Sequence, residues 1–485
     1  MNKIRSVKFN FLMNSILTVS AMIFPIITYP YVSRILQPEG IGKVSFANSV
    51  ITYFSMFAQL GIPTYGIRAC AKVRDNKEQL SRTVQEILLI NLITCFLVSA
   101  IYGMSLILVP QFRQEKTLFI VMGTLIIFNS IGAEWLYKGL EQYSYITVRS
   151  ILFKFIAVIA MFLLIHEKED YIIYGGITIF ASVGSNVLNL VNLRKYIYFY
   201  PVGNYNFRQH LRPISIFFAM SVATTVYTNM DSVMLGFIKG TTENGYYDAA
   251  VKIKNILVGF VASLGTVLLP RVSYYIEIGR KEEFERITQK ALKFVFLLAC
   301  PLCLYFIIFA RPSIYLLSGE LFEKAVLPMQ IIMPTLIFIG LTNITGIQIM
   351  VPLGMEKQVL YSEIVGAIIN IAVNCILIPE LGATGAAVGT LFAEISVMIV
   401  QVIVLRKVVL QNLIKMPYGK LLTALAGGTV LSGSLYLIPM NNFLLLFFSA
   451  LLFFLTYYVI LILMKESFVQ ELSKQIINKV RGRDK

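Results

Sequence analysis

Several acidic side chains interrupt long apolar runs in this sequence. Asp231 lies within "ATTVYTNMDSVMLGF" (residues 223–237), on the same predicted helical face as Thr224 and Thr228. An unpaired carboxylate in hydrocarbon costs about 2.5–3.5 kcal/mol, so it requires a partner, water or a proton. A carboxyl group whose pKa is shifted by such surroundings can bind a proton or a sodium ion. The ion-coupling candidates are therefore Asp231, Glu363 and Glu394.

Cationic side chains in apolar segments indicate a second kind of chemistry, the binding of anions. Asp248 and Lys252 are four residues apart with the acid first, which is the favourable order for an ion pair on a helix. Asn255 and Arg271 follow in the same segment, and Arg34 ends the first apolar segment. We predict that these residues line a cavity and that the cations neutralise an anionic headgroup.

Uncharged polar residues also recur at helical spacing inside apolar segments. Such stripes are costly against lipid, so they face either a water-filled cavity or a neighbouring helix that they bind by hydrogen bonds. The presence of charges on several of the same segments favours a cavity. The stripes are Asn48, Thr52, Ser55 and Gln59; Ser182, Ser185, Asn189 and Asn192; Asp248, Lys252 and Asn255; and Thr390, Glu394 and Gln401.

The elements that position these side chains are predicted to be membrane-spanning helices. Hydrophobic residues make up 57% of the 485, charged residues only 14%, and the mean hydropathy is +0.74. Apolar segments of about 20 residues, the length that crosses a bilayer as a helix, follow one another along the chain. We predict an all-α membrane protein with about fourteen spans. Their approximate ranges are 9–33, 44–65, 84–109, 117–137, 148–165, 171–193, 214–238, 245–270, 291–317, 326–352, 360–379, 383–405, 419–439 and 442–464.

The net charge of +16 follows the predicted topology. With fourteen spans, both termini and every second loop share one side of the membrane, and most of the 42 Lys and Arg residues lie there. The positive-inside rule places that side in the cytoplasm. The basic charge therefore does not indicate nucleic acid binding.

A weak internal repeat suggests two lobes. "GKVSFANS…LGIPTYGIRACAKVRDNKEQLSR", starting at Gly42, resembles "GYYDAAVK…LGTVLLPRVSYYIEIGRKEEFER", starting at Gly245. Six predicted spans separate the copies, so the two lobes would insert in the same orientation. The expected divisions are an N-lobe (1–195), a cytoplasmic linker (196–213), a C-lobe (214–410) and two further helices with a basic tail (411–485).

Other charged residues are interpreted as structural. Glu134, Lys138, Arg149 and Lys154 surround a short turn near one membrane surface, where ion pairs and side chains that reach the interface are common. His166 and His210 lie in opposite loops, so no histidine metal site is predicted.

Three stretches carry a resemblance to a known family. They are "RILQPEGIGKVSFANS", "EWLYKGLEQYSYITVRSILFKFIAVIAMFLLI" and "NMDSVMLGFIKGTTENGYYDAAVKI". The sequence resembles the Wzx-type flippases of lipid-linked oligosaccharide repeat units, which belong to the multidrug/oligosaccharidyl-lipid/polysaccharide exporter superfamily.

The resemblance implies two parallel six-helix lobes in a V around a central cavity, plus two C-terminal helices. It also implies a substrate, an undecaprenyl-diphosphate-linked oligosaccharide, which is moved from the cytoplasmic to the outer face for capsule, O-antigen or exopolysaccharide assembly. The family pattern falls here on Arg34, Gly40, Gly42, Gly139, Glu141, Asp231, Gly236, Gly245, Tyr247, Ala250 and Lys252.

The expected protein is thus a bacterial inner-membrane transporter, monomeric, with no catalytic residue, metal or cofactor. Its partners would be the lipid-linked oligosaccharide, membrane lipids and the polysaccharide polymerase and chain-length machinery. Two alternatives stay open. A drug/cation antiporter of the same superfamily would favour an acidic cavity, and a membrane polymerase or glycosyltransferase would need a large external loop or acidic catalytic residues in an early one.

Overall fold

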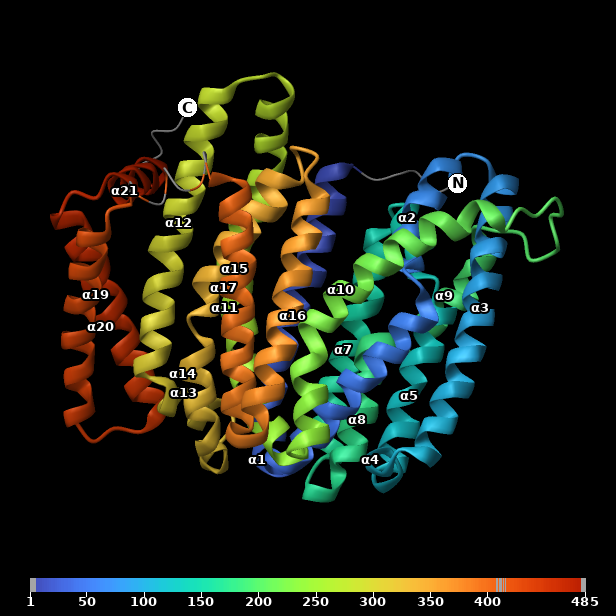
Figure 1. Cartoon of the computed structure of the whole chain (residues 1–485), viewed down its shortest axis with the longest axis horizontal. Coiled ribbons are helices and arrows are strands. Elements are labelled where there is room, and N and C mark those ends of the chain that lie inside the picture. The colour runs from blue at the N-terminus through green and yellow to red at the C-terminus, as the bar shows by residue number, and fades with distance from the viewer. Residues whose placement is uncertain (1–5, 407–408, 410–411, 413, 415, 481–485) are drawn as a thin grey trace. The chain divides into compact units, whose positions relative to one another are not determined.

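The computed structural model describes residues 6–406, 409, 412, 414 and 416–480, and it leaves the side chains of 7, 8, 263–273, 276, 277, 281, 472 and 475–480 outside that description. Within these residues the chain is helical throughout and contains no strand, as the sequence predicts. It divides into two compact units, Met1–Gly245 (unit 1) and Tyr246–Lys485 (unit 2). Figure 1 gives the helices their labels.

Unit 1 holds ten α-helices, among the residues that the structure describes, and short 3-10 and π segments. They are α1 (Val7–Gln59), α2 (Ile62–Val73), α3 (Lys77–Leu108), α4 (Pro110–Gln114), α5 (Lys116–Ile131), α6 (Glu134–Gly139), α7 (Tyr143–Leu164), η1 (Lys168–Asp170), α8 (Tyr171–Ile179), η2 (Phe180–Gly184), α9 (Asn186–Asn192), η3 (Leu193–Lys195) and α10 (Arg208–Ile238).

Unit 2 begins within α11 and continues to the C-terminal helix. Its elements are α11 (Thr241–Glu277), α12 (Lys281–Ile308), α13 (Ala310–Leu317), η4 (Glu320–Ala325), α14 (Val326–Ile332), α15 (Thr335–Thr342), η5 (Asn343–Met350), α16 (Glu356–Leu381), α17 (Ala383–Val404), α19 (Tyr418–Gly433), η6 (Ser434–Leu437), α20 (Asn442–Leu463) and α21 (Ser467–Val480).

The first two predicted spans are joined in one long element with a sharp break. Helix α1 runs from Val7 to Gln59, but Gln37 departs from helical geometry with φ 58° and ψ 179°. Pro38 explains the break, because a proline disfavours helical geometry at the residue before it and lacks the N–H of an intrahelical bond. The sequence "RILQPEG" therefore ends one helical segment and starts another.

Nine described helices are long and apolar enough to cross a membrane, or ten if the bent pair Glu320–Ile332 and Thr335–Met350 is one span. One of the nine, Phe9–Val73, covers two predicted spans. The predicted spans 214–238, 245–270 and 419–439 correspond to α10, α11 and α19, which are helical but are not among the nine. The count of fourteen is consistent with this arrangement and stays a prediction.

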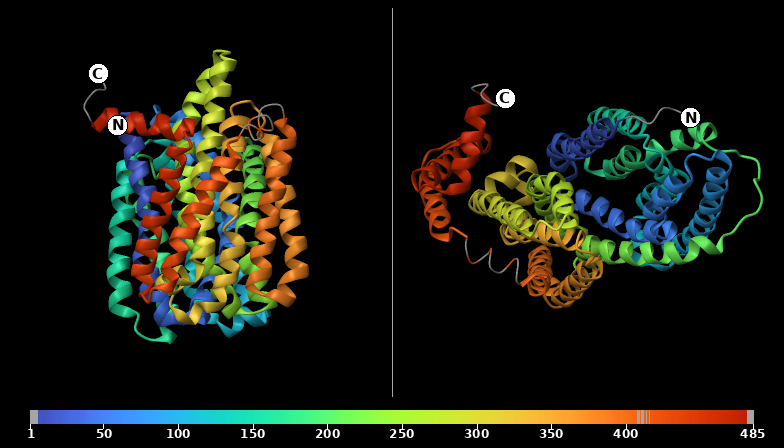
Figure 2. Two further views of the ribbon diagram at one scale, coloured as in Figure 1. Left: turned by 90° about the vertical axis from the view of Figure 1, so that its left-hand side faces the viewer. Right: turned by 90° about the horizontal axis from the view of Figure 1, so that it is seen from above.

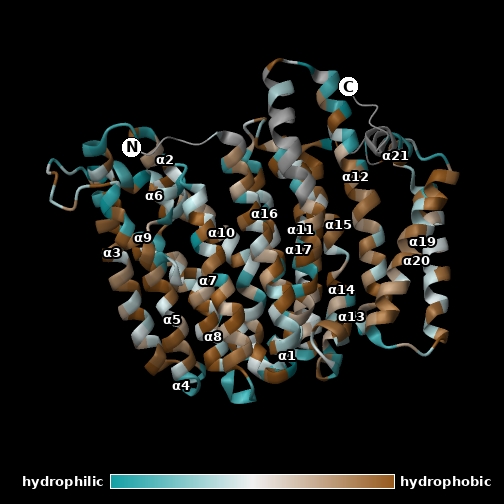
Figure 3. Cartoon of the chain, turned by 180° about the vertical axis from the view of Figure 1, so that it is seen from behind, coloured by the Kyte–Doolittle hydropathy of each residue, from teal (hydrophilic) through white to brown (hydrophobic). Residues whose placement is uncertain are grey.

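Apolar side chains cover the outside of the long helices. On α3, for example, Phe96 is 74% exposed and Leu108 is 76% exposed. Figure 3 shows hydrophobic residues along the middle of these helices and hydrophilic residues at many of their ends. A surface of this kind is stable against lipid tails and unstable in water, so the chain is a multi-pass membrane protein.

Each unit has its own apolar core. In unit 1, Phe46 of α1 packs edge-on against Phe119 of α5, with ring centroids 6.0 Å apart. In unit 2, α19 and α20 lie side by side in both views of Figures 1 and 2 and pack around Phe453, which is fully buried. The expected lobe boundaries at 195 and 214 stay a prediction; in the described contacts, α10 packs along α1 within unit 1.

Candidate functional site

The candidate cavity residues belong to two different units. Arg34, Asn48, Thr52, Gln59 and Asp231 lie in unit 1, and Asp248, Lys252, Asn255, Arg271, Glu363 and Glu394 lie in unit 2. The side chain of Arg271 is outside the described residues. A central cavity that all these residues line therefore stays a prediction, and each group is best described within its own unit.

Asp231 is buried where α10 packs against α1. The residue is only 5% exposed. Tyr53 of α1 approaches the same stretch, because its hydroxyl donates to the Val226 carbonyl oxygen at 3.5 Å and lies 3.9 Å from the Met230 sulfur. The carboxylate also acts electrostatically on that hydroxyl. The acid predicted as an ion-coupling residue is thus buried in the protein rather than exposed to lipid.

One turn beyond Asp231, Gly236 allows α10 to touch an aromatic ring. A Cβ atom at Gly236 would collide with the ring of Phe46 on α1. Phe46 also packs edge-on against Phe237, with centroids 5.2 Å apart. The family glycine at 236 is therefore a packing residue, which allows α10 to lie close against α1.

A second pair of family glycines brings α1 against the start of α11. A Cβ at Gly42 would overlap the Thr241 carbonyl oxygen and lie 2.7 Å from the Gly245 nitrogen, and a Cβ at Gly245 would overlap the Pro38 carbonyl oxygen. The amide of Asn244 donates to the Gly42 carbonyl oxygen at 3.1 Å. Backbone approaches backbone directly at this contact, which only glycine permits.

Gly40 belongs to the same segment but makes a looser contact. A Cβ there would lie 3.0 Å from that of Leu36, on the other side of the break in α1, and 3.5 Å from that of Tyr171 at the start of α8. Nearby, Arg34 is exposed, and its guanidinium donates to the Pro30 carbonyl oxygen one turn earlier on α1.

The polar stripe of α1 forms an interhelical hydrogen-bond group. Ser55, which is 4% exposed, accepts from Gln59 Nε2 at 3.0 Å and from Asn129 Nδ2 of α5 at 3.2 Å. Thr52 donates within its own turn to the Asn48 carbonyl oxygen at 2.7 Å. Part of this polar stripe therefore joins neighbouring helices by hydrogen bonds, which is the alternative to lining a water-filled cavity.

The "KGLE" turn joins three segments of unit 1. Glu141 has φ 56° and holds Arg74, with Oε1 2.8 Å from Nη1, while its Oε2 accepts from Asn10 Nδ2 at 3.1 Å. Gly139 allows the turn to approach α2, since a Cβ there would lie 3.0 Å from that of Cys70. Glu141 thus connects the start of α1, the end of α2 and the start of α7.

In unit 2, α11 meets α17 through a buried hydroxyl pair. Tyr247 is 4% exposed, and its hydroxyl lies 2.9 Å from that of Thr390. Glu394, one turn further along α17, is 5% exposed. Asp248 and Lys252 on α11 are partly buried, and Asn255 is exposed. The stripe on α17 is therefore internal, as predicted for a buried polar face.

Helix α16 adds further buried polar groups to this face. Gln401 of α17 donates from Nε2 to Ser362 Oγ at 3.1 Å and accepts from Thr345 of η5. Asn374 Nδ2 donates to Asn370 Oδ1 at 3.1 Å. Glu363 on the same helix is only partly buried, so it differs from Asp231 and Glu394 in its access to solvent or lipid.

A buried acid–histidine–tyrosine chain was not predicted from the sequence. His210 Nε2 of α10 lies 2.7 Å from Glu86 Oε2 of α3, and His210 Nδ1 lies 2.6 Å from the Tyr65 hydroxyl of α2. Glu86 is 0% and His210 2% exposed. Glu86 lies at the start of one apolar segment and His210 just before a different one, more than a hundred residues later. Nothing in the sequence near either residue indicates that the two side chains meet.

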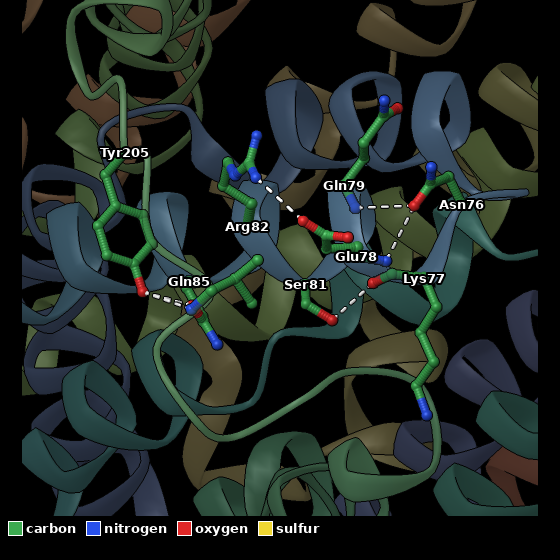
Figure 4. A network of polar contacts seen from close by, with 9 residues as sticks. Asn76, Lys77, Glu78, Gln79, Ser81, Arg82, Gln85 and Tyr205 are labelled. Carbon is green, nitrogen blue, oxygen red and sulfur yellow. Dashed lines mark hydrogen bonds and ion pairs between the residues drawn. The ribbon is translucent and has the colours of Figure 1, made fainter.

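The same end of α3 holds the predicted linker in place. Figure 4 shows the Tyr205 hydroxyl directed at Gln85, to which it donates at 2.7 Å. Gln85 Nε2 donates in turn to the carbonyl oxygens of Tyr198 and Tyr200, at 2.8 and 3.0 Å. Ser81 Oγ accepts from the Tyr198 backbone N–H at 2.9 Å. The segment between η3 and α10 is therefore fixed to unit 1.

The sequence matches two protein families. Residues 7–276 match the family described as "Polysaccharide biosynthesis protein", and residues 216–376 match the family described as "MatE". The "Putative O-antigen transporter" of Escherichia coli (strain K12) is 24% identical over 391 residues, which cover 80% of this chain and 94% of that protein. The protein of the same description from Shigella dysenteriae is 25% identical over 386 residues, 78% of this chain and 94% of that protein.

Solved structures share the fold. "Lipid II flippase MurJ, inward closed conformation" superimposes with a TM-score of 0.73 at 14% identity, covering 97% of this chain and 99% of that chain. An inward-facing multidrug resistance MATE family transporter of the MOP superfamily gives a TM-score of 0.59 at 14% identity, covering 84% of this chain and 99% of that chain. Proteins named as transporters and as a flippase thus share this fold, and none of these four is named as an enzyme.

Proposed function

Because the chain belongs to the polysaccharide biosynthesis protein family, we propose that it is a flippase for lipid-linked oligosaccharides. It moves an undecaprenyl-diphosphate-linked repeat unit from the cytoplasmic face to the outer face of a bacterial inner membrane, for assembly of a surface polysaccharide. The observation that carries the proposal is the combination of this family match with a flippase fold that covers 97% of the chain. The O-antigen transporters, matched over 94% of their length, support the same class of cargo.

The mechanism is alternating access without bond cleavage, so the protein uses no catalytic residue. Buried polar faces accept the sugars, and cationic groups such as Arg34, Lys252 and Arg271 neutralise the diphosphate. The polyprenyl tail stays in lipid. Movement follows if substrate binds the inward and outward states with different free energies.

Cation coupling is the second part of the mechanism that we propose. The burial of Asp231 and Glu394, each 5% exposed, supports it, because a carboxyl group out of water gains stability when it binds a proton or a sodium ion. Release of that ion on the opposite side would favour one conformation over the other. Glu363 is a weaker candidate on this argument, since it is only partly buried.

The cellular setting follows from the same proposal. Both termini lie in the cytoplasm, the protein works as a monomer, and the polymerase and chain-length machinery receive its product. The basic charge of the predicted cytoplasmic loops supports this orientation.

An antiporter for drugs or cations is the second candidate, and the MatE match over residues 216–376 is the observation that favours it. That class would bind a hydrophobic cation at acidic groups. The candidate cations Arg34, Lys252 and Arg271 and the segment "EWLYKGLEQ" argue against it and support an anionic cargo.

These functions can be distinguished in a deletion strain by measuring on which face of the membrane the lipid-linked oligosaccharide lies. Repeat units should accumulate on the cytoplasmic face of spheroplasts without the protein and be cleared by the wild-type chain. An antiporter would leave sidedness unchanged and alter drug resistance. A polymerase would leave sidedness unchanged while polymer length falls.

A further inference from the structure

Charged side chains gather where α6 meets α7 in unit 1. Glu134 binds two cations at once, since its Oε1 lies 2.8 Å from Lys138 Nζ and its Oε2 lies 3.1 Å from Arg149 Nη2. Arg149 Nη1 also donates to Asn186 Oδ1 at 3.1 Å. The Arg149 side chain is only 2% exposed, whereas those of Glu134 and Lys138 are 35% and 36% exposed. The cluster is therefore buried at Arg149 and partly exposed at Lys138, which is its open end.

A further cation lies deeper along α7. Lys154 Nζ donates to Ser20 Oγ of α1 at 3.1 Å, and Glu134 acts on it electrostatically. Lys154 is near the middle of α7, which is one of the helices able to span the membrane. Its position between two helices at mid-span differs from that of a lysine whose side chain reaches the membrane surface, and a cation at this depth is a candidate functional residue.

The charges of this cluster do not balance. The sequences of α5, α7, α8, η2 and α9 contain no acidic residue, and the acid of α1, Glu39, pairs with Lys43, so Glu134 is the carboxylate that the described residues place against Arg149. The nearby Glu141 is held by Arg74 and Asn10. Among the described residues, Arg149 Nε is buried and has no hydrogen-bond partner. Glu134 thus supplies one negative charge for three cations, Lys138, Arg149 and Lys154, which leaves a net charge of +2 that an additional anion would offset.

We propose that Arg149 and Lys154 form a binding site for the phosphate groups of a lipid headgroup, and that Glu134 is a built-in counterion which the ligand displaces. This inference rests on the proposed function for its preferred ligand, the diphosphate of the transported lipid. Guanidinium groups bind phosphate oxygens in pairs, and an ammonium group adds a point charge. The headgroup of an ordinary phospholipid has the same chemistry and is the alternative source.

The spacing of the two cations favours a diphosphate. Arg149 and Lys154 are five residues apart on α7, which corresponds to about 7.5 Å along the helix axis and about 140° around it. Two linked phosphates can each meet one cation over this distance more easily than a single phosphate can meet both. Lys138, at the open end of the cluster, is the cation that an arriving headgroup can reach first.

Native mass spectrometry of the purified full chain in detergent tests the site. Three ligands are titrated in separate experiments: undecaprenyl diphosphate, phosphatidylglycerol and inorganic pyrophosphate. Lys154→Met should weaken binding by about tenfold or more, as expected for a lost charge-assisted hydrogen bond. Glu134→Gln should strengthen binding, because it removes the competing anion and keeps an acceptor for Arg149. Lys154→Arg should restore binding, and the exposed Lys168→Met is the matched control.

Weaker binding by Lys154→Met together with stronger binding by Glu134→Gln supports the site. The lipid for which both changes in affinity are seen, undecaprenyl diphosphate or phosphatidylglycerol, identifies the ligand. Shifts with pyrophosphate alone overturn the assignment to a lipid. Equal affinities in all variants, or shifts in the same direction, overturn the site itself and leave a purely structural ion cluster. If repeat-unit sidedness does not depend on the protein but the opposite shifts appear, the proposed function fails and the site stands.

Discussion

The contact between Gly42 and Gly245 predicts a large effect for one added methyl group. In Gly42→Ala the new Cβ would overlap the Thr241 carbonyl oxygen and lie 2.7 Å from the Gly245 nitrogen. Both neighbours are backbone atoms and cannot rotate away. Overpacking of this kind costs about 1–3 kcal/mol. Replacing glycine by alanine within a helix also stabilises the protein by up to about 1 kcal/mol through the higher helix propensity of alanine. The measured change in stability is therefore smaller than the cost of the steric overlap.

A matched variant removes the propensity effect. Gly103→Ala is also within a helix, and a Cβ there meets nothing within 4 Å. The difference between the two variants therefore isolates the contact, about 2 kcal/mol, which corresponds to roughly 4–8 °C in the midpoint of thermal unfolding when unit 1 unfolds as one cooperative unit. Thermal unfolding of both variants in the same detergent measures it. Equal midpoints would refute the backbone contact between α1 and the start of α11.

Three further changes test separate contacts. A double-mutant cycle of Arg74→Gln and Glu141→Gln should give a coupling of about 1 kcal/mol in unfolding free energy, since each side chain is about one third exposed; additive effects would contradict the ion pair. Tyr247→Phe should lower stability by about 1 kcal/mol through loss of its hydroxyl contact with Thr390, and an unchanged unfolding midpoint would argue against that contact. Asp231→Asn should abolish the dependence of flipping on a cation gradient in proteoliposomes while leaving expression unchanged; retained dependence would remove Asp231 from the coupling role.

Much of the fold follows from composition and periodicity. The all-α membrane class, the positions of most spans and the membership of the polysaccharide biosynthesis protein family are confirmed by the described helices and the family match. Pro38 also marks the break in α1. These features depend on local sequence, in which apolar length and proline geometry act directly on the backbone.

The partners of polar side chains could not be predicted in the same way. Ser55 and Asn129 belong to different helices, and nothing in either local sequence specifies that they meet. Lys154 was likewise not among the candidate site residues, because its contact with Ser20 appears only when the helices are packed. The glycines at 42 and 236 were found through family resemblance, and the structure supplies their physical reason, close approach of neighbouring segments.

Transport by the purified chain tests the central claim most directly. Fluorescent lipid-linked oligosaccharide would be placed in proteoliposomes, and the fraction accessible to a membrane-impermeant quencher would be followed over time with and without the protein. Our account predicts that the protein exposes the inner-leaflet pool at a rate well above that of protein-free vesicles, and that a fluorescent phospholipid without the oligosaccharide diphosphate is not moved. Equal rates with and without the protein, in vesicles shown to contain the folded chain, would contradict it.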